Sequence, residues 1–134
     1  MGSFNTIDIG ATGAQLGSTW LDVLAHNMAN LNTVRSGDED PFRARLVVAQ
    51  ERLTGNRGSG VDVVQITEVQ GDPPMVYQPD HPLANEEGYV MLPVVDLAAQ
   101  MSDLILATRA YQANLSVIKS GREAYESALK IGRQ

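Results

Sequence analysis

The chain has 134 residues and a formal net charge of −6, and its 43% hydrophobic content is enough for the core of one ordinary domain. The absence of cysteine excludes disulfides, thiolate nucleophiles and zinc ribbons. An acidic chain without a basic stripe is a poor binder of nucleic acid, because no cluster of cations is present to displace the counterions of phosphate groups. No uncharged stretch is long and apolar enough to predict a membrane-spanning helix.

The first predicted element is a helix over residues 5–32, where small and apolar residues recur at helical spacing. Asp8 and Asp22 are its only acidic or basic side chains apart from a histidine. Three glycines lie inside it: Gly10, Gly13 and Gly17. Each costs about 1 kcal/mol relative to alanine in a helix interior, so the helix needs packing partners. A helix with so few charges is expected to be buried on more than one side, where glycines permit a close approach of backbones.

A loop is predicted after this helix, over residues 36–41, because a glycine, an acidic run and a proline follow one another there. Residues 42–53 fit a strand and a helix alike. The glycines of residues 54–60 predict a flexible connection to the next element.

A strand is predicted over residues 61–69. Val61 and Val63 lie in one phase of this strand, and Val64 and Ile66 lie in the other. Because side chains alternate between the two faces of a strand, this change of phase predicts a bulge or burial on both faces.

Two further short strands are predicted at residues 75–77 and 89–92, with a proline-containing loop between them. Asp96 is the expected N-cap of a second helix, which runs to Ile131 and ends at Gly132.

These elements predict an α+β fold. The N- and C-terminal helices are expected to pair as an antiparallel coiled coil, with a small β-rich insertion between them. We therefore expect a discontinuous helical domain, formed by residues 1–35 plus 94–134, and an insertion formed by residues 36–93.

The second helix carries a heptad seam, in which alternating steps of four and three residues give apolar side chains at eight of ten positions. The ten positions are Leu97, Met101, Leu104, Thr108, Tyr111, Leu115, Ile118, Arg122, Tyr125 and Leu129. Four residues of this seam are expected to pack on the first helix: Leu104, Tyr111, Leu115 and Ile118. Their expected partners there are Leu21, Leu24, Met28 and Leu31. One marginal partner helix cannot cover all the apolar positions of so long a helix, which points to assembly.

No arrangement of residues predicts an active site. His26 is expected on a helix surface, and His81, between Asp80 and Pro82, is expected to be a turn residue with a local hydrogen bond. The acidic run at residues 38–40 lacks the spacing of a calcium loop and is expected to be solvated. We therefore predict no catalytic residue, metal ligand, cofactor or small-molecule substrate.

Two short motifs resemble those of a known family. Residues 27–33 read Asn-Met-Ala-Asn-Leu-Asn-Thr and resemble the motif N-(L/I/M)-A-N-x-x-T near the start of the axial proteins of the bacterial flagellum, which form its rods and hooks. Residues 109–115 read Arg-Ala-Tyr-Gln-Ala-Asn-Leu and resemble the R-x-Y-Q-A-N motif in the C-terminal helix of those proteins.

The middle of the chain narrows this resemblance. Residues 41–50 are similar to the Y/F-R-x-x-x-V-x-F-Q stretch of the family. Residues 76–84 and 88–93 are similar to the block Y-x-P-x-H-P-x-A…G-Y-V-x-x-P, which is typical of proximal rod proteins within it. The resemblance covers essentially the whole chain.

The resemblance implies a structural subunit of the proximal rod of the flagellar basal body, which transmits torque and supports motility and is not an enzyme. It implies helical polymerisation through the terminal helices, on the periplasmic side of the inner membrane. The implied partners are further copies, other rod subunits, the membrane ring and rod adaptor, and the flagellar export apparatus. Because no Lys or Arg precedes Arg35, export without a cleaved signal peptide is expected.

The candidate assembly residues lie in the two motifs and along the seam. They are Asn27, Met28, Asn30, Leu31, Thr33, Leu104, Arg109, Tyr111, Gln112, Asn114, Leu115 and Ile118. Among them, four amides are expected to form hydrogen bonds with neighbouring subunits: Asn27, Asn30, Gln112 and Asn114.

Three alternatives remain at this point. Another proximal rod subunit of the same family is disfavoured by the block at residues 76–93. A soluble coiled-coil adaptor or export chaperone would form a small stable oligomer in solution. A cell-wall hydrolase would use Asp38, Glu39 or Asp80, although nothing in the sequence pairs these carboxylates across a cleft.

Overall fold

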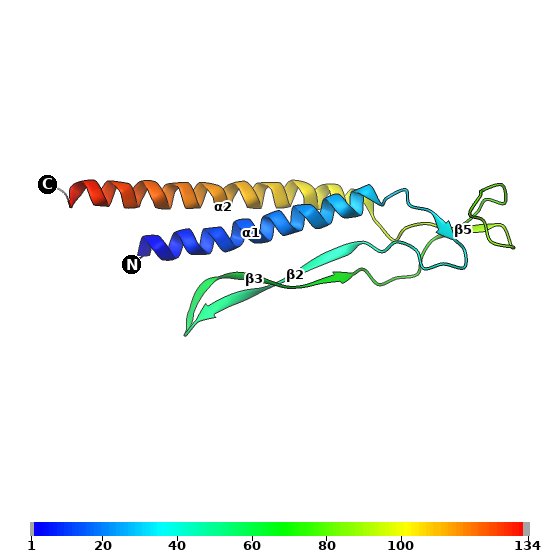
Figure 1. Cartoon of the computed structure of the whole chain (residues 1–134), viewed down its shortest axis with the longest axis horizontal. Coiled ribbons are helices and arrows are strands. Elements are labelled where there is room, and N and C mark those ends of the chain that lie inside the picture. The colour runs from blue at the N-terminus through cyan, green and yellow to red at the C-terminus, as the bar shows by residue number, and fades with distance from the viewer. Residues whose placement is uncertain (1, 133–134) are drawn as a thin grey trace.

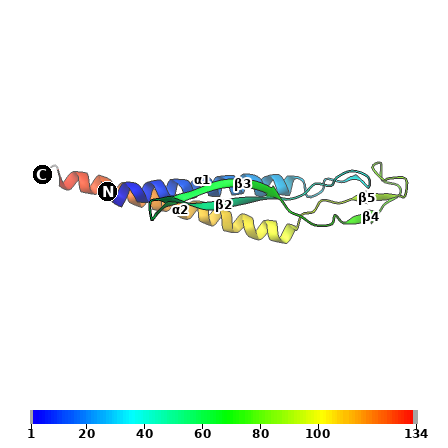
Figure 2. The same ribbon diagram turned by 90° about the horizontal axis from the view of Figure 1, so that it is seen from below.

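The computed structural model describes residues 2–132, with side chains from residue 5 onward, and its main feature is a pair of long helices (Figure 1). α1 spans Gly2–Ala29 and α2 spans Leu97–Ile131. The two helices run antiparallel and pack along the length of α1, and α2 continues past the start of α1 (Figures 1 and 2). Together with the strands between them, this confirms the predicted α+β fold.

The ends of the helices follow from local chemistry. Asp96 caps α2 as predicted, because its Oδ1 accepts hydrogen bonds from the backbone N of Ala98 (2.9 Å) and of Ala99 (3.2 Å). α1 ends three residues earlier than predicted. There the side chain of Asn30 donates to the backbone oxygen of His26 (2.9 Å), which satisfies a carbonyl that has no partner inside the helix.

A long hairpin forms the second layer. β2 (Arg45–Thr54) and β3 (Arg57–Glu68) pair antiparallel, so residues 42–53, which were ambiguous, are mainly strand. The pairing jumps from Val48 opposite Gln65 to Ala49 opposite Val63, which leaves Val64 as the extra residue of a bulge. This confirms the bulge that the change of phase in the sequence predicted.

The prediction of a flexible connection over residues 54–60 is wrong. Gly55 and Asn56 form a tight turn between the strands, and the rest of that segment belongs to β2 or β3. Gly55 has φ +62°, which fits a turn with glycine at its first central position. The glycines there serve the turn and the strand pairing rather than a linker.

The tip of the molecule is a small sheet beyond the helices. β1 (Arg35–Ser36), β5 (Tyr89–Met91) and β4 (Met75–Tyr77) pair in that order. The two short strands predicted here are confirmed, with the second ending one residue early, whereas β1 was not predicted. Val90 is fully buried at the centre of this sheet.

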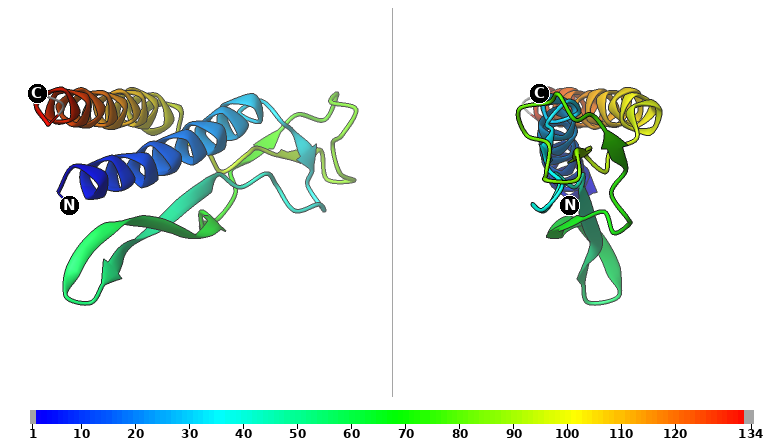
Figure 3. Two further views of the ribbon diagram at one scale, coloured as in Figure 1. Left: turned by 60° about the vertical axis from the view of Figure 1, so that its left-hand side comes forward. Right: turned by 90° about the vertical axis from the view of Figure 1, so that its right-hand side faces the viewer.

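α1 forms the middle layer of the helical end. α2 packs on one side of it and the β2–β3 hairpin on the other, as the end-on view shows (Figure 3). This confirms that α1 is buried on more than one side. The division into a domain of residues 1–35 plus 94–134 and an insertion of residues 36–93 stays a prediction.

Candidate assembly surface

The contact between the helices lies along a heptad stripe of α2. Eight of the less exposed residues of α2 advance by alternating steps of four and three: Gln100, Leu104, Ala107, Tyr111, Asn114, Ile118, Gly121 and Tyr125. This spacing is that of an antiparallel coiled coil, as predicted. Ala107 is fully buried, so the stripe is closest to α1 near its middle.

Four of the ten predicted seam positions are wrong by one residue. The positions of Leu104, Tyr111, Ile118 and Tyr125 agree, but Gln100, Ala107, Asn114 and Gly121 take the places expected for Met101, Thr108, Leu115 and Arg122. Leu115 is 44% exposed, so it is not buried in the contact between the helices. At Met101 and Leu115 the sequence pattern favoured the larger apolar side chain, whereas the structure places the neighbouring amide side chains of Gln100 and Asn114 in the contact with α1.

The glycines of α1 explain this preference. A Cβ atom on Gly10 would lie 3.0 Å from Cγ1 of Ile118, and one on Gly17 would lie 3.1 Å from Cβ of Tyr111. A Cβ atom on Gly13 would come within 2.5 Å of Oδ1 of Asn114. The three glycines therefore form a groove on α1 that receives side chains of α2, which is the close approach that the sequence predicted.

Asn27 joins three elements of the fold. Its side-chain nitrogen donates to the backbone oxygen of Arg45 in β2 (2.9 Å) and to Oε1 of Gln100 in α2 (2.8 Å), while its oxygen accepts from the backbone N of Arg45 (2.8 Å). Asn27 is fully buried and Gln100 is 5% exposed. Both amide donors of Asn27 are therefore used within the chain, and its expected contact with neighbouring subunits stays a prediction.

The other motif residues have different surroundings. Asn30 accepts from Oγ1 of Thr33 (3.2 Å), and Asn114 donates to the backbone oxygen of Ala110 in its own helix (2.9 Å). Met28 and Leu31 are half-buried, as are Leu104, Tyr111 and Ile118. Three predicted residues remain exposed and available to neighbouring subunits: Arg109, Gln112 and Leu115.

α2 has apolar side chains on faces that nothing in this chain covers. Eight of them are exposed: Leu97, Met101, Ile105, Leu106, Leu115, Val117, Leu129 and Ile131. On a helix of 3.6 residues per turn, Leu97, Met101, Ile105 and Leu115 lie on one flank of the α1 contact, and Leu106 and Val117 lie on the other. A helix that is apolar on several faces is typical of one that is buried on several sides.

Arg52 and Asp62 form an ion pair across the hairpin, and its hydrogen bonds lower the pKa of the Asp62 carboxyl and raise the pKa of the Arg52 guanidinium. Both side chains are about half exposed, so the pair is screened by water. Within residues 2–132, no three His, Asp or Glu side chains are grouped so that they could hold a metal ion.

The histidines and loop acids have the surroundings that the sequence predicted. His26 is exposed on α1 with its ring centroid 5.5 Å from that of Phe42, and Nδ1 of His81 accepts a hydrogen bond from the backbone N of Leu83 (3.1 Å). Glu39 is exposed and lies 3.6 Å from the Arg35 guanidinium. Neither helix within the described residues has a stretch that is both long and apolar enough to cross a membrane.

Comparison with known proteins agrees with this geometry. A family model described as the C-terminal part of flagellar basal-body rod FlgEFG proteins matches residues 86–131, which include all of α2. The flagellar basal-body rod protein FlgC of Salmonella typhimurium is 35% identical over 134 residues, covering 99% of this chain and 100% of the relative. The FlgC proteins of Bacillus subtilis (33% identical, 99% and 100% covered) and Aquifex aeolicus (36%, 94% and 94%) match similarly.

A paired-helix fold with uncovered apolar faces, together with these matches, defines the class as structural proteins of the flagellar basal-body rod rather than enzymes. Rod proteins assemble with further rod components, and they reside in the flagellar basal body. Within this class, the chain belongs to the FlgC family.

Sequence reasoning missed the contributions of Gln100, Ala107 and the backbone of Arg45. Gln100, Ala107, Asn114 and Gly121 recur every seven residues, directly before the larger residues of the predicted seam. That seven-residue repeat of small and amide residues, considered together with the glycines of α1, could have predicted that Gln100 and Ala107 face α1.

Proposed function

We propose that this chain is a subunit of the proximal rod, which polymerises through its terminal helices, transmits torque and supports motility. The observation that carries the proposal is the uncovered apolar surface of α2. One face of this helix packs on α1, and the exposed apolar residues lie on the two flanks beside that face. In a polymer, the helices of neighbouring subunits would cover these two flanks.

The area of the molecule supports the same proposal. The chain exposes 9270 Å² of surface, whereas a compact monomer of 14.5 kDa exposes about 6,900 Å². An elongated subunit has this additional exposed surface as a single chain, and neighbouring subunits would cover part of it in a polymer. A finished monomeric protein rarely leaves contiguous apolar surface of this kind open to water.

We further propose the location and the partners. The subunit would lie on the periplasmic side of the inner membrane, reached through the flagellar export apparatus. Its neighbours would be further copies, other rod subunits, and the membrane ring and rod adaptor. Arg109, Gln112 and Leu115 support contacts with other subunits, because they are predicted assembly residues of the C-terminal motif whose side chains are exposed.

The substitution Leu115→Asp tests the proposal. Leu115 is 44% exposed, so a carboxylate there is solvated in the single chain and is expected to leave its unfolding transition nearly unchanged. In the assembled rod, the same carboxylate would be buried without a partner. A strain carrying the variant in place of the natural chain is therefore expected to lose motility and rod incorporation.

The matched control is Leu83→Asp, because Leu83 is 46% exposed but lies in the loop between β4 and β5, away from α2. This control is expected to retain motility. Normal swimming and normal basal bodies in the Leu115→Asp strain would show that the flank of α2 that includes Leu115 takes no part in assembly.

A further inference from the structure

The β2–β3 hairpin is attached firmly to the rest of the molecule at its base. Both backbone groups of Arg45 bind the buried side chain of Asn27. The neighbouring residue, Ala44, is 2% exposed, and its backbone N and O are paired with Val94 (3.2 Å) and Val69 (2.8 Å). These hydrogen bonds therefore fix this end of the hairpin relative to α1.

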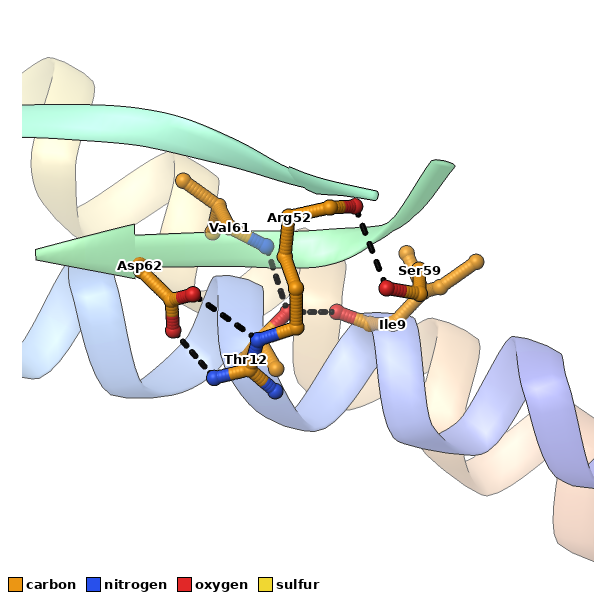
Figure 4. Close-up of polar contacts among 6 residues, drawn as sticks. All are labelled: Ile9, Thr12, Arg52, Ser59, Val61 and Asp62. Atoms are coloured by element: carbon orange, nitrogen blue, oxygen red, sulfur yellow. Dashed lines mark hydrogen bonds and ion pairs between the residues drawn. The ribbon is translucent and has the colours of Figure 1, made fainter. Parts of the chain in front are cut away.

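The distal part of the hairpin is attached to α1 through a hydroxyl group. The backbone N of Val61 donates to Oγ1 of Thr12 (3.1 Å), and that hydroxyl donates to the backbone oxygen of Ile9 (2.8 Å), as Figure 4 shows. Gly60 sits directly over Thr12 with φ +136°, and a Cβ atom there would overlap the hydroxyl oxygen. The glycine thus provides both the backbone conformation and the space that the contact needs.

The region around this contact is poorly covered. Residues 51–58, which form the end of the hairpin, are all exposed. A cleft of about 490 Å³ lies between α1 and the hairpin, with Leu16 and Thr19 of α1 on one wall and Val61 and Val63 on the other. A neutral hydrogen bond at a part-buried site competes with water, so we expect this part of the hairpin to separate from α1 more readily than the base does.

We propose that Thr12 and the Gly60–Val61 backbone form a latch that sets the angle of the hairpin to α1, with the Asn27–Arg45 contact as its hinge. When the latch is closed, the hairpin lies along α1 as in this structure. When it opens, the hairpin swings about its base and the cleft widens. The inference concerns the single chain, so it does not depend on the assembly proposed above.

The natural chain has no cysteine, which allows spin labels to be placed at two chosen positions. Ser18→Cys and Asn56→Cys report the distance from α1 to the end of the hairpin, and Ala25→Cys and Leu46→Cys report the distance at its base. All four side chains are exposed. Pulsed electron resonance on the purified full chain gives the distance distribution for each pair.

Thr12→Val removes the hydroxyl but keeps the shape of the side chain. The distal distance distribution is expected to broaden and shift to longer distance, while the basal distribution stays unchanged. Gly60→Ala is expected to do the same, because its Cβ atom would displace Thr12. Thr12→Ser, which keeps the hydroxyl, is expected to match the natural chain.

Thr19→Val is the matched control, because the hydroxyl of Thr19 donates to Gln15 in its own helix (3.1 Å) rather than to the hairpin. Circular dichroism establishes that each variant keeps its helices. An unchanged distal distribution in both Thr12→Val and Gly60→Ala would overturn the latch. Equal broadening at the distal and basal pairs, or equal broadening in Thr19→Val, would overturn it as well, since either result indicates general loosening.

Discussion

Asn27 is the residue on which the junction between the helices and the hairpin depends. Its amide forms hydrogen bonds with the backbone N and O of Arg45 and with the side chain of Gln100. Every polar atom of the Asn27 side chain therefore has a partner inside the fold. A side chain of another type cannot reproduce this set, because an amide is needed to donate twice and accept once. The fixed position of Arg45 in turn sets where β2 begins.

Asn27→Ala is expected to lower the free energy of unfolding by about 1–3 kcal/mol for each buried group left without a partner. Urea denaturation followed by circular dichroism measures the change. Asn32→Ala is the control, because Asn32 is exposed just after α1 and its replacement is expected to have little effect. Equal stability of the two variants would show that water replaces the amide of Asn27 without loss.

At the scale of single residues, the sequence singled out Asn27 but not the partners that its side chain has within the chain. The motif at residues 27–33 pointed to Asn27, yet the prediction placed its partners in other subunits. The reason is physical. Arg45 lies 18 residues away and Gln100 lies 73 residues away, and only the packing of three elements brings them within hydrogen-bond distance of Asn27. The local role of His81 was predicted correctly because its partner is two residues away.

Among the elements, the contact of α1 with α2 depends on the glycine groove. Gly17 faces Tyr111, and a Cβ atom there would lie 3.1 Å from Cβ and 3.3 Å from Cα of that residue. Because one of these atoms is backbone, the helices themselves would have to move apart to admit a larger side chain.

Gly17→Val is therefore expected to destabilise the fold by about 1–3 kcal/mol through overpacking, although valine is a better helix former than glycine. Thermal and urea unfolding measure the effect. Gly58→Val is the comparison, since a Cβ atom on Gly58 in β3 would meet no atom within 4 Å. Stabilisation of the chain by Gly17→Val would mean that the two helices do not need this close contact.

Element types were predicted well where the pattern is local and poorly where it is not. The cap at Asp96, the bulge at Val64 and the strands at β4 and β5 each follow from a few neighbouring residues. The register of α2 on α1 does not, because it depends on which side chains fit the groove on the other helix. The glycines near Gly55 suggested a linker, whereas the pairing of β2 with β3, which the local sequence does not reveal, makes them part of a hairpin.

At the scale of the whole molecule, the chain is a rod-shaped unit with three layers at one end and a small sheet at the other (Figures 1 and 3). Its core is thin, because the middle layer of the helical end is the single helix α1, which packs on α2 and on the hairpin. The two flanks of α2 beside the α1 contact and much of the hairpin are exposed to solvent. α2 therefore has two roles: one face packs on α1 and stabilises the single chain, and its exposed flanks are the surfaces proposed for assembly.

We expect the purified chain to associate reversibly as its concentration rises, because the exposed flank of α2 includes Met101 (53% exposed) and Ile105 (59%). The double variant Met101→Gln, Ile105→Gln is expected to weaken this association while leaving helix content unchanged. Analytical ultracentrifugation at several concentrations measures the oligomeric state of the natural chain and of the double variant. A single stable small oligomer in both would instead favour a coiled-coil adaptor.

The antiparallel pairing of α1 and α2 has a practical consequence for labelling the protein in cells. It brings the first turn of α1 and the last turn of α2 to the same extremity, opposite the small sheet (Figure 1). A reporter fused to either terminus would crowd the extremity where the helices must pack. The exposed Glu86–Glu87 turn lies at the other extremity, so an epitope inserted there is the better choice for following the subunit by microscopy.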